Sequence, residues 1–90
     1  MSVSGLIGQT LLGDDVRVVG YIVINATGSQ LCAVLLESFP PQCGGDSVEI
    51  TGLEVLGLDL EEEQDVRWTD TPVVFRGRWS DEIFTALEIV

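Results

Sequence analysis

A single, mostly β domain is the fold class that this sequence predicts, on three observations. The chain has 90 residues, and domains usually need about 50 to 250 residues, so we expect one domain over residues 1–90. Hydrophobic residues make up 46% of the chain and charged residues 21%, a composition typical of folded globular proteins. Segments dense in β-branched residues alternate with turns rich in Gly and Pro, which is the pattern of short consecutive strands.

A short helix followed by a long strand is predicted at the start of the chain. Apolar residues recur at helical spacing over Ser4–Leu12, which favours a weakly amphipathic helix. Val16–Asn25 is dense in Val and Ile and is predicted as a strand. Gly20 in its middle indicates a bulge or a sharp bend.

The second strand and the loop after it come next. Gln30–Leu36 follows a turn at Ala26–Ser29 and carries apolar residues on both faces, so we expect it to form a hairpin with the preceding strand. The segment Glu37–Gly45 is predicted as a loop, because it contains Pro40-Pro41 and Gly44-Gly45.

Three further strands complete the predicted sheet. Ser47–Val55 alternates apolar and polar residues and is the third strand. Leu60–Gln64 is interpreted as a short helix or loop. Thr71–Trp79 and Ile83–Ile89 are predicted to form a second hairpin around a turn at Ser80–Glu82.

Five strands in this order match a small OB-like Greek-key barrel with a short N-terminal helix. The alternative is an open antiparallel sheet with the helix packed on one face, an α+β arrangement. We favour the barrel, because closing a sheet removes its unpaired edges.

The charge balance excludes several classes of function. Fifteen acidic residues against four arginines give a net charge of −11, and the chain has no lysine and no histidine. Nucleic-acid affinity comes mainly from Lys and Arg, so we expect no nucleic-acid binding and repulsion from anionic lipids. Without histidine, Ser-His and Cys-His catalysis are excluded, as are zinc sites that use histidine. The sequence has no uninterrupted run of about 20 apolar residues, so we expect no membrane-spanning helix.

The cysteines and the chain start bear on the cellular compartment. Cys32 and Cys43 are an even pair that permits one disulfide. We favour the disulfide over two buried free thiols, because Cys43 lies in the Pro/Gly loop, where a cross-link is useful. Met1–Gly5 lacks the basic residues of a secretory signal, so no leader is expected in the chain as written.

The segment Glu37–Gly45, with Cys32 upstream and Gly20–Val23 before it, resembles a group of small, functionally uncharacterised bacterial proteins that are often exported or lipoprotein-like. These proteins share a Gly-aromatic strand, a Leu-Cys strand, a Pro-Pro-x-Cys-Gly-Gly loop and a Val-x-Trp-Thr-Asp strand entry, which is Val66–Asp70 here. The likeness covers roughly Val16–Trp79. It implies an extracytoplasmic or secreted domain with a disulfide between the two cysteines, and it implies no particular activity.

A candidate binding face combines aromatic residues with two arginines that alternate with them on the fourth strand. Its members are Tyr21, Trp68, Phe75, Arg76, Arg78 and Trp79. Arg76 and Arg78 are expected on the opposite face of this strand from Phe75 and Trp79. These arginines suit a carboxylate or an acidic loop of a partner. The alternative, which we favour, is that the arginines pair with Glu88 or Glu49 across the sheet.

Acidic side chains supply two weaker candidate sites. A run of carboxylates forms a candidate weak cation site at Asp59, Glu61, Glu63 and Asp65. It lacks the pattern of a calcium loop, so we favour a solvated surface. Glu37 is the best single candidate for an acid in a hydrolase, although a strand-end residue facing water is the better interpretation.

These patterns favour a non-enzymatic binding or interaction module outside the cytoplasm, with no metal and no cofactor. Its partner is a protein or a small molecule. One alternative is a small acid-dependent hydrolase or metal-binding protein, which needs two convergent carboxylates in a pocket. Another is a structural domain that self-assembles through a strand edge, and the oligomeric state stays open.

Overall fold

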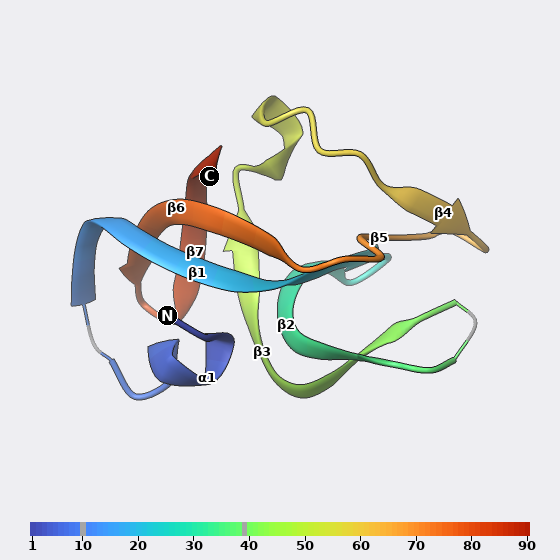
Figure 1. Cartoon of the computed structure of the whole chain (residues 1–90), viewed down its shortest axis with the longest axis horizontal. Helices are drawn as coiled ribbons and strands as arrows, with labels where there is room; N and C mark the ends of the chain where they lie inside the picture. The colour runs from blue at the N-terminus through green and yellow to red at the C-terminus, as the bar shows by residue number, and fades with distance from the viewer. Residues whose placement is uncertain (10, 39) are drawn as a thin grey trace.

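Figure 1 shows the computed structural model, which describes residues 1–9, 11–38 and 40–90. Thr10 and Phe39, which belong to the predicted helix and the predicted loop, lie outside the described residues. The elements are α1 (Val3–Leu6), β1 (Leu11–Asn25), β2 (Gly28–Leu36), β3 (Gln42–Thr51), the 3-10 helix η1 (Leu53–Val55), β4 (Glu61–Glu63), β5 (Val66–Trp68), β6 (Val73–Ser80) and β7 (Ile83–Ile89). The prediction of a mostly β domain with one short N-terminal helix is confirmed. None of the described helices has the length and apolar character that a membrane crossing requires.

The sheet has seven strands in the described residues, two more than predicted. β1 pairs antiparallel with β2 and with β6, β2 with β3, and β6 with β7, whereas β3 and β7 run parallel. The pairings therefore lead from β1 through β2, β3, β7 and β6 back to β1. The two additional strands, β4 and β5, form a hairpin in which β5 also pairs with β1 (Figure 1).

β1 changes partner after Gly20, because it pairs with β6 as far as Gly20 and with β2 from Tyr21 onward. A Cβ atom at Gly20 would lie 2.9 Å from the carbonyl oxygen of Cys32 and 2.9 Å from Leu31 Cδ1. Glycine is therefore required for the close approach of the two strands. The register shift of β1 against β6 lies upstream, between Leu12 and Val16.

The main core is enclosed by the five long strands and α1. Its buried members are Val3, Leu6, Val18, Ile22, Leu31, Val48, Ile50, Leu53, Phe75, Trp79, Phe84 and Ala86. The helix is much shorter than the predicted Ser4–Leu12. Leu11 and Leu12 instead pair with Ser80 and Trp79 of β6, because the strand ladder supplies the backbone hydrogen bonds that a longer helix would have made.

A second apolar cluster covers the opposite face of β1 and β2. Its members are Val23, Cys32 and Trp68, with Tyr21, Leu35, Cys43 and Val66 packed against them. Tyr21 lies opposite Cys32 in the ladder, whereas the next pair, Ile22 and Leu31, belongs to the main core. The middle of β2, at Leu31 and Cys32, is thus buried on both faces, as its two-sided apolar pattern predicts.

The predicted disulfide between Cys32 and Cys43 is confirmed and lies in this second cluster. It joins β2 to β3 beside a register shift of the β2–β3 ladder. In Figure 1 the far end of this hairpin extends away from the other strands, at the lower right.

The loop around Gly44 and Gly45 is shorter than predicted, because both glycines lie inside β3. Gly45 has a φ of 61°, a left-handed conformation that favours glycine. A Cβ atom at Gly44 would lie 2.7 Å from Leu36 Cδ2. The two glycines therefore allow β3 to be irregular and tightly packed at this point, and they do not form a loop.

The segment predicted as a short helix or loop over Leu60–Gln64 is instead the β4 strand and the start of its turn. Gln64 and Asp65 form the two-residue turn, both with positive φ, as tight hairpins require. The three glutamates of β4 are all exposed on its outer edge, where charge discourages pairing with another chain. The third strand also ends earlier than predicted, at Thr51, and is followed by η1.

Thr69 is a buried polar residue that extends the contact between β5 and β1, with 4% of its surface exposed. Its amide donates a hydrogen bond to the Ile22 carbonyl oxygen at 3.0 Å. Its hydroxyl oxygen Oγ1 accepts one from the Ile22 amide, also at 3.0 Å. Both backbone polar groups of Ile22 are thereby satisfied by one residue.

Replacing Thr69 by valine is expected to lower the free energy of unfolding by about 1–3 kcal/mol, since the buried Ile22 amide loses its acceptor. Thr69→Ser keeps the hydroxyl and is the matched control. Urea denaturation followed by circular dichroism measures both variants. A valine variant as stable as the serine variant would contradict this role for the hydroxyl.

Candidate functional site

Three of the four aromatic members of the predicted binding face are buried, and Tyr21 is half-buried. Phe75 and Trp79 are 0% and 1% exposed in the main core. Trp68 and Tyr21 belong to the second cluster, where Trp68 is buried and its Nε1 donates to Asp70 Oδ1 at 2.8 Å. The three buried rings therefore contribute packing energy rather than the aromatic recognition surface that we expected. Phe75 and Trp79 are buried because they lie on the inner, apolar face of β6.

The two arginines of that face lie on the outer side of β6, as the alternation predicts. Arg76 Nε donates to Glu88 Oε1 at 2.9 Å across the β6–β7 ladder, so this predicted pairing is confirmed. The hydrogen bond and charge of Arg76, with a smaller contribution from Arg17, hold the pKa of Glu88 below its usual value. Glu49 lies elsewhere, opposite Gln30 in the β2–β3 ladder.

The acidic run does not form a coordination site in the described structure. Asp59, Glu61, Glu63 and Asp65 are all exposed, and no group of three or more metal-ligating side chains is present among the described residues. Glu37 is also exposed, just after the end of β2.

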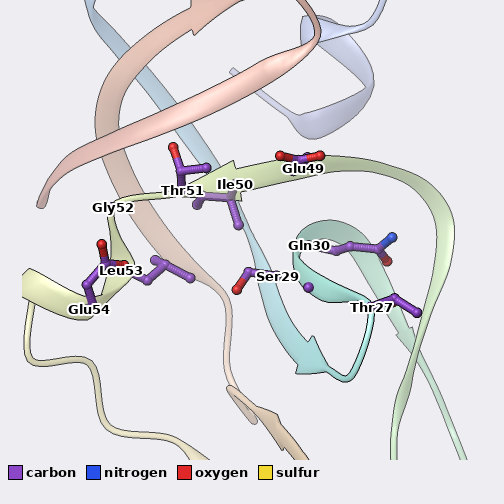
Figure 2. A pocket seen from close by; sticks show the side chains of 10 residues that line it. Thr27, Ser29, Gln30, Glu49, Ile50, Thr51, Gly52, Leu53 and Glu54 are labelled. Atoms are coloured by element: carbon purple, nitrogen blue, oxygen red, sulfur yellow. The ribbon is translucent and has the colours of Figure 1, made fainter.

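A hollow of about 400 Å³ lies where the β1–β2 turn, the paired ends of β2 and β3, and η1 meet (Figure 2). Its lining contains two buried apolar residues, Ile50 and Leu53. Polar side chains from three segments complete the lining: Thr27, Ser29, Gln30, Glu49, Thr51 and Glu54. An apolar part with polar groups around it is typical of small-molecule sites.

Local backbone geometry holds the two ends of this hollow. At the β1–β2 turn, Asn25 Oδ1 accepts hydrogen bonds from the Thr27 amide at 2.9 Å and from the Thr27 hydroxyl at 2.5 Å. At the other end, Gly52 has a φ of 87° and a Cβ there would lie 2.6 Å from the Ala86 carbonyl oxygen. The chain therefore turns sharply between β3 and η1, which brings Glu54 to the lining.

The two carboxylates of the lining lie at opposite ends of the hollow in Figure 2. Both Glu49 and Glu54 are exposed, whereas a general acid that stays protonated near neutral pH is usually buried. The lining contains hydroxyl, amide and carboxylate groups and no arginine. Chemically, it is suited to accept hydrogen bonds from hydroxyl or amine groups and to repel anions.

Sequence analysis did not identify this hollow. Its polar residues are ordinary turn and strand residues that come from Thr27–Gln30, Glu49–Thr51 and Glu54. The one available signal was the Thr-Gly-Ser turn, which we interpreted only as a connection between strands. Comparison with protein-family models, with curated proteins and with solved structures gives no match for this chain.

Proposed function

We propose that this protein is a non-enzymatic binding module built on an OB-type barrel, and that it binds an uncharged, hydroxyl-rich ligand in the hollow of Figure 2. The observation that carries the proposal is the hollow itself, with its polar residues around Ile50 and Leu53. Hydroxyl, amide and carboxylate groups at this density favour sugars over anionic ligands.

The strand order supports the OB-type barrel. The pairing circuit β1, β2, β3, β7, β6 and back to β1 is the arrangement expected for a five-stranded Greek-key barrel. In this interpretation β4 and β5 are an insertion between the third and fourth barrel strands. OB-type barrels bind ligands on the face of their second and third strands, and the hollow is lined by β2 and β3.

The disulfide supports a location outside the cytoplasm. Disulfides persist in oxidising compartments and are rare in the cytosol, where thiols are kept reduced. The Cys32–Cys43 bridge therefore makes extracytoplasmic ligands, such as cell-envelope or extracellular saccharides, the first to be tested.

At least one of three neutral hexasaccharides, made of glucose, galactose or N-acetylglucosamine, is expected to bind in this hollow. We expect at least one to shift the backbone amide signals of Ser29, Gln30 and Thr51 in heteronuclear NMR spectra of the labelled protein. Single-stranded dT12 should shift none, because the protein carries a net charge of −11.

Two substitutions separate the hollow from the rest of the surface. Gln30→Ala is expected to weaken saccharide binding about tenfold, through the loss of one or two side-chain hydrogen bonds. Gln42→Ala is the matched control, since Gln42 is exposed on β3 outside the hollow. The proposal fails if none of the three saccharides shifts these signals, or if Gln42→Ala weakens binding as much as Gln30→Ala.

A further inference from the structure

A second surface, on other strands, concentrates positive charge on this acidic protein. Three of the four arginines, Arg17, Arg76 and Arg78, lie on β1 and β6. Arg17 is directly opposite Arg76 in the antiparallel ladder. Arg78 follows two positions along β6 on the same exposed face. Like charges placed opposite each other in a sheet are unfavourable unless an anion lies between them.

The ion pair of Glu88 indicates that this surface accepts a carboxylate. The Glu88 carboxylate bonds to Arg76 from the adjacent strand β7. Arg17 also lies near enough to contribute to the lowered pKa of this carboxyl group. Half of the Glu88 side chain is exposed, so the ion pair is open to solvent and exchangeable. A carboxylate from another molecule therefore finds the same guanidinium groups within reach.

Two valines make the surface suitable for a protein partner. Val19 and Val74 are opposite each other in the β1–β6 ladder and are 40% and 36% exposed. They lie two residues from Arg17 and from Arg76, respectively, on the same outer face. Arginine is enriched in protein–protein interfaces, and the exposed valines beside it add apolar area that a partner can bury.

We propose that the outer face formed by Arg17, Val19, Val74 and Arg76 binds a partner-protein segment that carries carboxylates around an apolar residue. Charge complementarity selects this occupant, because guanidinium groups bind carboxylates strongly. The remaining surface carries the excess of acidic residues and repels such a segment elsewhere. The carboxylates are thereby directed to this face.

The test is an NMR titration with two blocked pentapeptides, EEVEE and its uncharged match QQVQQ. We expect EEVEE to shift the amide signals of Val19 and Val74, and we expect QQVQQ to bind about tenfold more weakly. Arg17→Gln/Arg76→Gln should weaken EEVEE binding about tenfold or more. Arg67→Gln is the matched control, because Arg67 is the remaining arginine of the chain and lies on β5. This variant should bind EEVEE as the wild type does.

Glu88→Gln gives an independent readout, because it removes the internal competitor for Arg76. This variant is expected to bind EEVEE several-fold more tightly. Weaker binding of EEVEE by Glu88→Gln than by the wild type would overturn the proposal. Equal affinity of the wild type for EEVEE and QQVQQ, or weaker binding of EEVEE by Arg67→Gln, would also overturn it. Identical shifts with inorganic phosphate would indicate a general anion site instead. If the Val19 and Val74 signals shift in the same way when the protein alone is concentrated, a second copy of the chain occupies this face. That outcome also overturns the proposal.

Discussion

Replacing Cys43 by serine is expected to lower the free energy of unfolding by about 2–5 kcal/mol. The Cys32–Cys43 bridge closes a short loop and limits the freedom of the unfolded chain. It also occupies the second apolar cluster, where Cys32 is fully buried. A 90-residue domain buries a comparatively small core, so the loss is a large share of its total stability.

Urea denaturation of the oxidised protein and of Cys43→Ser measures this effect. Ser47→Ala is the matched control, because Ser47 lies opposite Cys32 in the β2–β3 ladder but is outside the bridge. Intact mass after alkylation, with and without prior reduction, reports the pairing directly. An unchanged urea midpoint for Cys43→Ser, in protein whose wild-type thiols are blocked until reduced, would show that the bridge does not stabilise the fold.

Replacing Trp79 by alanine is expected to cost about 3–5 kcal/mol of the free energy of unfolding. Its ring is fully buried on the inner face of β6, directly opposite Phe84 of β7. Its Nε1 also donates to the Gln9 carbonyl oxygen at 3.0 Å, which ties the segment after α1 to the sheet. Alanine removes both the packing and this hydrogen bond.

Trp79→Phe separates these two contributions. Phenylalanine keeps an aromatic ring in the core but has no N–H group for Gln9, so we expect a loss of about 1–2 kcal/mol. Urea denaturation followed by circular dichroism compares the variants without relying on tryptophan fluorescence. If the alanine variant is no less stable than the phenylalanine variant, Trp79 does not fill the core as described.

The candidate sites were predicted to different degrees, and individual residues show why. The alternation of Phe75, Arg76, Gly77, Arg78 and Trp79 correctly separated two faces of β6. It did not show that the core covers the aromatic face, because the strands that cover it are distant in sequence. The hollow was not predicted, because its polar residues become neighbours only when β2 pairs with β3 and Gly52 turns the chain into η1.

Local sequence patterns were sufficient for the mostly β class, for β7 at Ile83–Ile89, for both main hairpins and for the cysteine pair. The class, the strand and the hairpins depend on a few neighbouring residues, such as a β-branched run or a tight turn, and two cysteines permit only one bridge. Tertiary pairing decided the rest. Pairing with β6 makes Leu11 and Leu12 part of β1. Pairing of β5 with β1 places the acidic segment in the β4–β5 hairpin. The physical reason is that a backbone with weak local preference adopts the conformation in which a distant strand satisfies its hydrogen bonds.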